Sequence, residues 1–372
     1  MTAPEGRASA TDVHARLGVV RDLLARHGAR RAVLRSRSNF AWLTIGGDGH
    51  VALSTETAVA KIVIDAGTAR VLAPVNEADR LAEEELAGLP FEIEKQPWEA
   101  ATQLDRGGDG HTLDDNAVEQ ELAPVRATLG SLEQERMAWL GRRITLVLDT
   151  VAASLEPGVT EREASAEIGR GLGADGVRAD VVRAPVLLVA ADDRIARYRH
   201  PLPTSAAIRR RAMLIAVAER WGLHVALTRV RELEPPSADL DRRRLATRDV
   251  LAAMLAASLP GRTLGSILET AQRAYADAGF PDEWRLHHQG GLLGYRPRER
   301  LATPNDPTVL APGMAVAWNP SITGAKLESS HLLSDASGRL RALTGTEPIG
   351  QSPAEDRTDR PPRTLLGVDR RS

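Results

Sequence analysis

The sequence predicts an α+β protein made of two domains and a short tail. Its 372 residues are 42% hydrophobic and 26% charged, which is long enough for two cores and too balanced for a disordered chain. Short strand-like and helix-like segments alternate in the first third, whereas long helices precede groups of strands in the remainder. We therefore expect domains over residues 1–125 and 126–348, and a flexible tail over residues 349–372.

The first domain is expected to be a small α/β unit. Apolar residues recur every three or four positions over residues 12–27, which predicts a helix that Gly28 ends in the left-handed conformation. A Gly- and Asp-rich stretch at 105–115 is typical of a linker near the domain boundary at Val125. Strands are expected at 32–34, 59–64, 70–73 and 91–94, with a polar helix at 77–87.

The second domain is expected to begin with two capped helices. Ser131 and Gln134 fit a capping box, and Thr160 and Glu163 fit another for a helix that ends near residue 172. Pro-Gly links at 155–160 and 259–263 each join two helices, which suggests two similar halves, although such turns are common. Further strands are expected at 184–191, 212–218, 223–230, 314–319 and 325–333, and further helices at 247–257 and 264–278.

Composition excludes several classes of function. The net charge is −2 and no long run of one sign occurs, which argues against nucleic-acid and anionic-membrane partners. The chain has no cysteine, so disulfides, thiolate catalysis and cysteine-ligated metals are excluded. The first residues lack an apolar signal core and the longest apolar stretch, 184–191, is too short to span a membrane, so we expect a cytoplasmic protein. No phosphate loop or nucleophile elbow occurs.

His200 is the first candidate for chemistry. It follows Tyr198 in a loop between two predicted strands, and Pro201 and Pro203 stiffen that loop. A rigid loop can hold an imidazole for proton transfer. The alternative is a loop histidine that bonds to a nearby carbonyl group.

His288 is the second candidate. Adjacent side chains on an extended segment point to opposite faces, so we expect His288 and not His287 to line a pocket. Gly290 and Gly291 allow a ligand to approach the backbone closely, although a structural bulge explains them equally well. His224 lies inside a predicted strand and is expected to be a satisfied sheet histidine. The other five histidines are expected in solvated or capping positions: His14, His27, His50, His111 and His331.

Polar residues near the end of the second domain complete the candidate set. Asn319 ends a predicted strand, and Lys326 and Glu328 share one face of the next strand. Glu328 could orient an imidazole or anchor a cationic group of a substrate. The alternative is a surface ion pair that contributes little.

These segments resemble the pita-bread family that includes aminopeptidase P, prolidase and creatinase. The resemblance covers nearly the whole folded chain and rests on residues 38–44, 156–161, 200–204, 288–291, 313–320 and 324–328. It implies a pita-bread catalytic domain, a smaller creatinase-like N-terminal domain and a homodimer paired through that domain. It also implies that His200 matches the family's substrate-contacting histidine and that His288 matches its histidine metal ligand.

The resemblance also identifies what is missing. The family's peptidases bind two metal ions with two Asp, one His and two Glu, but strands 214–218 and 225–229 carry no carboxylate at the matching positions and Asn319 replaces a glutamate. His288 and Glu328 alone remain, so we predict no metal and no cofactor. Glu219 could substitute only through a register shift.

Creatinase, which the sequence resembles, works without metal and uses the loop histidine that corresponds to His200. Thr228 and Asn319 stand where creatinase has glutamates that grip a guanidinium group, so creatine is a poor candidate. A neutral amide fits better, because a buried site with no anion cannot offset the desolvation of a cation. Tyr295 stands near the position of a further substrate histidine of the peptidases.

We therefore expect a metal-independent hydrolase of a carbon–nitrogen bond in a small amide, dipeptide-like or amidino substrate, with His200 as acid and base. The expected catalytic residues are His200, His288 and Glu328, and the expected substrate contacts are Asn319, Tyr295, Thr228 and Tyr198. One alternative is a noncatalytic pita-bread protein that binds a small ligand or a protein partner. Another is an Xaa-Pro-type metallopeptidase with atypical ligands.

Overall fold

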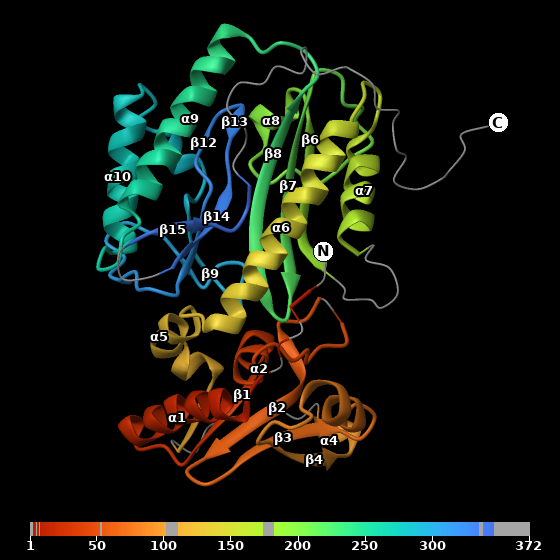
Figure 1. Cartoon of the computed structure of the whole chain (residues 1–372), viewed down its shortest axis with the longest axis vertical. Helices are drawn as coiled ribbons and strands as arrows, with labels where there is room; N and C mark the ends of the chain where they lie inside the picture. The colour runs from red at the N-terminus through yellow and green to blue at the C-terminus, as the bar shows by residue number, and fades with distance from the viewer. Residues whose placement is uncertain are drawn as a thin grey trace, which may run out of the picture.

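The computed structural model describes residues 3–4, 6, 8–52, 54–101, 111–173, 182–334 and 338–345. The predicted tail, 349–372, and much of the predicted linker lie outside these residues. Figure 1 shows two parts stacked along the longest axis, with the N-terminal part below in red and orange. No helix within the described ranges is both long and apolar enough to cross a bilayer.

The N-terminal part is built on a five-stranded mixed sheet in the order β4-β3-β2-β1-β5. The four predicted strands are present and somewhat longer than expected, whereas β5 was not predicted because three residues carry too little pattern. β5 runs parallel to β1 and β4 runs parallel to β3, while the other pairs are antiparallel. The strands are β1 (Arg31–Ser36), β2 (Thr57–Asp65), β3 (Ala69–Pro74), β4 (Glu92–Gln96) and β5 (Thr112–Asp114).

Helices surround this sheet. Gly28 ends α1 with φ 62° and ψ 22°, so the predicted left-handed stop is confirmed. The predicted polar helix at 77–87 is a single turn that continues as a π-helical turn, and α2 was missed because it is almost wholly buried and has no polar face. The helices are α1 (Ala10–His27), α2 (Arg37–Leu43), α3 (Ala78–Arg80), η1 (Leu81–Glu85), α4 (Trp98–Ala101) and α5 (Asp115–Arg126).

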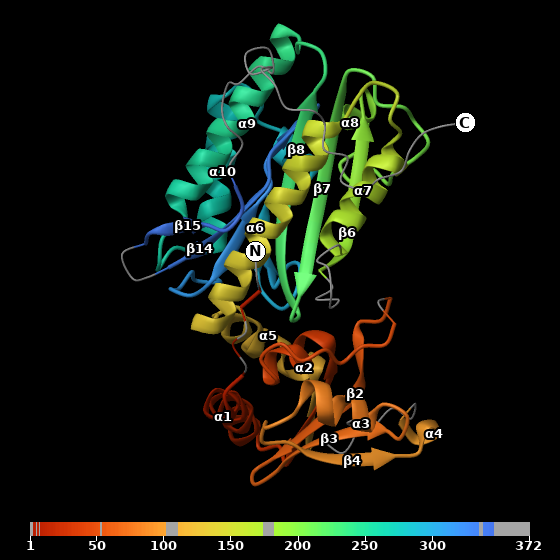
Figure 2. The same ribbon diagram turned by 45° about the vertical axis from the view of Figure 1, so that its right-hand side comes forward.

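The first half of the second part is an antiparallel sheet covered by two helices. The sheet is β6 (Arg183–Ala191), β7 (Arg211–Arg220) and β8 (Leu223–Glu232), as predicted. The helices are α6 (Ser131–Ser154) and α7 (Glu161–Gly173), and Figure 2 shows α6 lying across β7 and β8. The short α8 (Arg194–Arg197) follows β6.

The caps of α6 and α7 differ in how well they were predicted. At α7 the Glu163 amide donates to Thr160 Oγ1 at 3.2 Å and the Thr160 amide donates to the Glu163 carboxylate at 2.8 Å, which confirms that capping box. At α6 the prediction is wrong by one residue, because the Gly130 amide donates to Glu133 at 2.7 Å. The helix therefore begins with Gly130 as its N-cap.

The second half repeats the order of two helices followed by strands. The α9 helix starts at Ala238, before the predicted residue 247, because Ser237 caps it. The prediction of one strand over 325–333 is wrong. The strand is interrupted at Leu327 and Glu328, and the two resulting strands pair with different neighbours. The helices are α9 (Ala238–Ala257), α10 (Leu264–Asp277) and η2 (Glu283–Leu286). The strands are β9 (Gly290–Leu293), β10 (Arg300–Leu301), β11 (Ala315–Trp318), β12 (Ser321–Ile322), β13 (Ala325–Lys326), β14 (Ser329–Leu333) and β15 (Leu340–Ala342).

The two halves contact each other through β8 and β14, and they carry the same helix-cap signature. Thr160 begins α7 and forms an isolated bridge with Ala207, and Thr263 caps α10 and forms one with Val309. This correspondence supports the predicted pair of similar halves. Between them, Ser330 Oγ accepts from the Ala226 amide at 3.0 Å and donates to the Ala226 carbonyl at 2.9 Å.

A buried arginine joins the N-terminal part to the rest. Arg126, at the end of α5, donates to the Glu299 carboxylate at 2.6 Å and to Asn39 Oδ1 in α2 at 2.6 Å. It also pairs with Glu119 at 2.9 Å. Because Arg126 and Glu299 are both buried, each needs the other for charge compensation.

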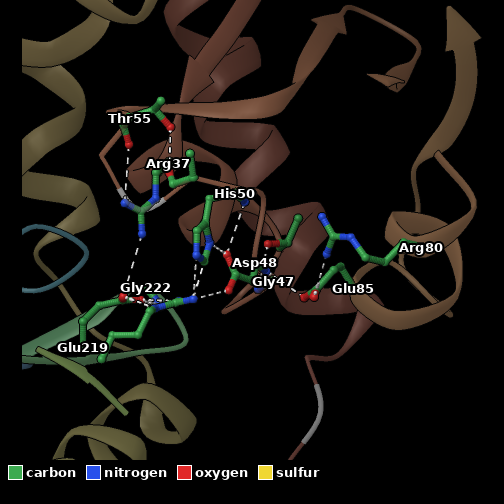
Figure 3. A network of polar contacts seen from close by, with 12 residues as sticks. Arg37, Gly47, Asp48, His50, Thr55, Arg80, Glu85, Glu219 and Gly222 are labelled. Atoms are coloured by element: carbon green, nitrogen blue, oxygen red, sulfur yellow. Dashed lines mark hydrogen bonds and ion pairs between the residues drawn. The ribbon is translucent and has the colours of Figure 1, made fainter. Parts of the chain in front are cut away.

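Figure 3 shows a second polar contact between the two parts. Arg183 of β6 donates to Asp48 at 2.6 Å and to Glu219 at 2.6 Å, and His50 contacts Asp48. The expectation that His50 is a solvated loop histidine is therefore wrong. Through Arg183, these polar contacts connect Asp48 in the loop after α2 to Glu219 at the end of β7.

Another histidine also departs from its expected setting. His331 lies in β14 between β11 and β15 and is buried, with its Nε2 atom 2.9 Å from Ser329 Oγ. It was expected near the surface because its strand was taken as terminal, but β15 covers that edge. Burial lowers the pKa of His331 to about 4.

We predict that Arg126→Met lowers the free energy of unfolding by about 3–5 kcal/mol, because it leaves the Glu299 carboxylate buried and unpaired. Urea denaturation of the whole chain measures this change. The matched control is Arg170→Met, since Arg170 forms an exposed ion pair with Glu167 and its loss should cost less than about 1 kcal/mol. Equal effects of the two substitutions would contradict the assigned role of Arg126.

We also predict a pH-dependent contribution of His331 to stability. Because its pKa falls from 6.5 to about 4 on folding, the fold favours the neutral ring, and this stability is complete above pH 6.5 and is lost as the pH falls toward 4. The full loss is about 3 kcal/mol. Denaturation of wild type and His331→Gln at several pH values should show a weaker acid destabilisation in the variant. His14→Gln, at an exposed helical position, should keep the wild-type profile.

Candidate active site

Three histidines from two distant segments come together in the second part. His200 lies in the loop after α8, and His287 and His288 lie between η2 and β9. The Nε2 atoms of His200 and His287 are 3.1 Å apart, and one ring nitrogen from each of the three residues lies within 4.8 Å of the others. We call these three residues the histidine cluster.

The expectation that only His288 would face the site is wrong. The rings of His287 and His288 are stacked, with centroids 4.3 Å apart and planes at 27°, and both lie near the His200 ring. Strict alternation requires the pleat of a paired strand, and these two residues precede β9 and belong to no strand. Sequence reasoning therefore missed His287, although the adjacent pair was visible.

The two glycines that follow serve the sheet. Gly290 and Gly291 adopt φ values of 105° and 157°. A Cβ at Gly290 would lie 2.0 Å from the Ala317 carbonyl oxygen, and one at Gly291 would lie 2.0 Å from that of Arg300. Close packing between strands explains these glycines. It favours a structural role over the alternative that they allow a ligand to approach the backbone.

The surroundings of the histidine cluster favour the neutral form of all three rings. Burial, followed by the charge of Lys326, lowers the pKa of His287 to about 2. Burial and then Arg298 lower the pKa of His288 to about 4, and burial followed by Lys326 lowers the pKa of His200. A neutral imidazole has one donor and one lone pair, so when His200 donates to His287 its own lone pair stays free to accept a proton.

The histidine cluster has unused hydrogen-bonding capacity. The Nδ1 atoms of His287 and His288 are buried and find no partner among the described residues. Buried polar atoms are normally satisfied by protein, water or a ligand. These two atoms therefore mark a place where a bound molecule or ion would gain contacts.

Glu328 lies beside the histidine cluster as a buried, fully engaged carboxylate. Arg298 donates to its Oε1 atom at 2.7 Å and Thr228 Oγ1 donates to its Oε2 atom at 3.1 Å. Burial alone would raise the pKa of Glu328, but the charges of Lys326 and Arg298 outweigh it and lower that pKa. Glu328 is therefore an ionised group that orients its neighbours and has no proton to give.

Lys326 supplies positive charge to the same place. Its side chain is buried, and burial lowers its pKa. It influences the titration of all three histidines of the cluster and of Glu328. The sequence indicated a Lys326 and Glu328 pair, but it could not indicate Arg298, which lies 30 positions from Glu328.

Two predicted substrate contacts remain available. Asn319 follows β11, and its amide donates to the Gln289 carbonyl at 3.1 Å, next to His288. Its Oδ1 atom is buried and finds no partner in the described part of the chain. Tyr198 is exposed in the loop before His200, and its ring lies 5.0 Å from the Arg194 guanidinium carbon.

The expectation that Tyr295 bonds to substrate is wrong. Its side chain is buried, its hydroxyl donates to the Glu133 carboxylate, and it accepts from Arg16 at 3.3 Å. These partners come from α6 and α1, so Tyr295 belongs to the contact between the two parts. Partners 162 and 279 positions away leave no local sequence signal.

The residues present do not fit a carboxylate-bridged pair of metal ions. The positions next to Thr228 on the same face of β7 and β8 are apolar: Met213 pairs with Val230 and Ile215 pairs with Thr228. Glu219 is bound by Arg183 at the end of β7, so the register shift that would bring it to the site does not occur. A bridging ligand needs a free carboxylate, and Glu328 is held by Arg298.

A cavity of about 670 Å³ lies between α9 and the edge of β8. Its lining includes Thr228, Val230, Leu251, Leu255, Lys326 and Glu328. It therefore shares Lys326 and Glu328 with the surroundings of the histidine cluster. Its size suits a small molecule.

The chain is similar to known proteins in both sequence and structure. Residues 135–336 match the model of Metallopeptidase family M24. No curated protein sequence matches the chain.

Solved structures similar to this chain include three of differing description. The dipeptidase PepE from Mycobacterium ulcerans is 19% identical, with 92% of this chain and 98% of that chain covered and a TM-score of 0.72. The prolidase from Pyrococcus horikoshii OT3 is 16% identical, with 91% and 99% covered and a TM-score of 0.73. The N-terminal domain of FACT complex subunit SPT16 from Cicer arietinum is 12% identical, with 92% and 96% covered and a TM-score of 0.65.

Proposed function

The chain belongs to metallopeptidase family M24, and from that premise we propose that it hydrolyses a carbon–nitrogen bond in a small, neutral amide or dipeptide-like substrate without a pair of metal ions. The observation that carries this proposal is the 3.1 Å contact between His200 and His287. It holds a neutral imidazole beside a face that has lost the carboxylates of a two-metal site.

His200 acts as base and then as acid. Its lone pair takes a proton from water as the water oxygen bonds to the carbonyl carbon of the substrate. The protonated ring then returns the proton to the leaving nitrogen as the carbon–nitrogen bond breaks. His287 fixes the plane of the His200 ring through their shared hydrogen bond.

The remaining site residues position the substrate. Asn319 Oδ1 accepts an N–H group of the amide, and His288 lies on the same side of the site. The buried charge of Lys326 favours the negative charge that develops on the carbonyl oxygen. Glu328 accepts hydrogen bonds from Arg298 and Thr228 and thereby keeps the Arg298 guanidinium in place.

The apolar face favours a substrate without charge at the scissile group. The buried Ile215 pairs with Thr228, which contacts Glu328, on strands where the family resemblance implies carboxylates. The nearby carboxylate of Glu328 is already paired with Arg298, so a cation moved to such a surface has no free anion to compensate its desolvation. An amidino substrate is therefore disfavoured relative to a neutral amide.

A noncatalytic binding protein is the second candidate function. One structural neighbour is described as a subunit of a complex and not as a peptidase, and the loss of metal-binding carboxylates is compatible with a retained pocket that only binds. An Xaa-Pro-type metallopeptidase with atypical ligands is disfavoured, because Glu219 and Glu328 are both held by arginines.

The assembly and location that we propose follow from the family resemblance and the composition. We propose a homodimer paired through the N-terminal part, located in the cytoplasm. Sedimentation of the purified chain and fractionation of the source cells test these two statements separately.

We predict that His200→Ala lowers kcat by about 100-fold or more while KM changes little, because the substitution removes the group that moves the proton. Wild type and variant are assayed against dipeptides, N-acyl amino acids and guanidino acids. Turnover should be confined to the neutral amide bonds.

The matched control is His14→Ala, which removes an exposed imidazole bonded to the Ala10 carbonyl of its own helix. Its turnover should equal that of wild type. Equal turnover by His200→Ala would refute the acid–base role. Binding without turnover of any compound by wild type would favour the noncatalytic alternative.

We predict that prolonged dialysis against a chelator leaves turnover undiminished, because the described residues offer no free bridging carboxylate to hold two ions. Metal content is measured by elemental analysis before and after dialysis, and turnover is measured on the same samples. Two ions per chain whose removal abolishes turnover would overturn the metal-independent mechanism.

A further inference from the structure

We propose that the histidine cluster binds one divalent transition-metal ion of the zinc class through His200, His287 and His288, and that this ion inhibits the hydrolase. The binding half of this inference stands on geometry alone. The inhibitory half rests on the proposed function of His200.

The spacing of the ring nitrogens suits a shared ion. Two imidazole nitrogens that ligate zinc tetrahedrally, each at about 2.0–2.1 Å, lie about 3.3 Å apart, and the His200 and His287 Nε2 atoms are 3.1 Å apart. His288 brings a nitrogen within 4.8 Å of both. Small rotations of side chains are enough to close the three nitrogens on one ion.

The type of ligand selects the type of ion. Three imidazoles suit Zn²⁺, Co²⁺, Ni²⁺ and Cu²⁺, whereas Mg²⁺ and Ca²⁺ require oxygen ligands. The Nδ1 atom of His288 is buried and finds no partner among the described residues, so this ring has a nitrogen available as the third ligand. The ligand set differs from two Asp, one His and two Glu, since it contains no carboxylate.

The charges that face the histidine cluster influence which ligand can occupy the fourth coordination position of the ion. Lys326 and Arg298 are positive and Glu328 is negative, and all three influence His200. A net positive surrounding weakens the binding of a bare dication and favours an anionic fourth ligand such as hydroxide, chloride or a carboxylate. We therefore expect the bound ion to carry an anion on the side of Lys326.

The ion and the proton compete for one lone pair. His200 cannot accept a proton from water while its lone pair is coordinated. Zn²⁺ at one equivalent should therefore suppress turnover, and a chelator should restore it. This dependence is the opposite of that of an enzyme activated by metal.

Titration of the chelator-treated full chain with Co²⁺ tests the site, because visible absorption reports cobalt bound to nitrogen ligands. Wild type should saturate at one equivalent, in the presence of excess Mg²⁺. His287→Gln and His288→Gln should each weaken binding at least tenfold, and His14→Gln should bind as wild type does. Circular dichroism and a thermal melt establish that each variant is folded.

The outcomes separate the two proposals. Absence of cobalt absorption in wild type, or equal binding by wild type and a folded His287→Gln variant, would overturn the site. A second tightly bound equivalent would also contradict it. Saturable binding in a protein that turns over no substrate would support the site and refute the proposed hydrolase, whereas full turnover by the cobalt-saturated protein would refute inhibition.

Discussion

The buried carboxylate of Glu328 is the contact on which the site depends. It receives one hydrogen bond from Thr228 in β8 and one from Arg298 in the loop between β9 and β10, so it bridges the two halves of the second part. The Thr228 amide also donates to the Glu328 carbonyl at 3.3 Å. Because an unpaired buried charge is costly, this pairing fixes how the two halves meet. The loop of His200 is joined to the segment of His287 by a separate contact, in which Arg199 donates to the Glu283 carboxylate at 2.9 Å.

The face of β7 and β8 beside that contact is apolar next to Thr228, whereas the family resemblance implies carboxylates there. The pita-bread fold is confirmed by the family match and by neighbours that superpose over nearly their whole length. A fold at this level of identity does not carry an activity with it. Met213 and Ile215 turn the face into an apolar wall, and the acidic groups that remain nearby are committed to arginines. The fold holds three imidazoles close together, and two of them share a hydrogen bond.

Proton transfer and metal binding are two uses of those same lone pairs. A rigid, partly buried cluster of neutral imidazoles is suited to both, and the surrounding charges decide between them. Lys326 and Arg298 disfavour an added proton as well as an added cation, whereas Glu328 favours both. In the reaction that we propose, this balance would let His200 gain a proton briefly. It also makes a soft, nitrogen-preferring ion the species best able to compete.

The sequence by itself determined the elements with strong local signals and the main chemical absence. The α1 helix with its stop at Gly28, the Thr160 and Glu163 cap, the strands β6 to β8 and the missing carboxylates are all legible from neighbouring residues, because periodicity, capping and residue type act over a few positions. Only the tertiary structure decided that His287 contacts His200. It also decided that the Tyr295 hydroxyl is hydrogen-bonded to Glu133 and Arg16. The ion pair between Glu219 and Arg183 was likewise not predictable. Each of these depends on segments tens to hundreds of positions apart. Packing of the whole chain brings such segments together, and no local pattern encodes it.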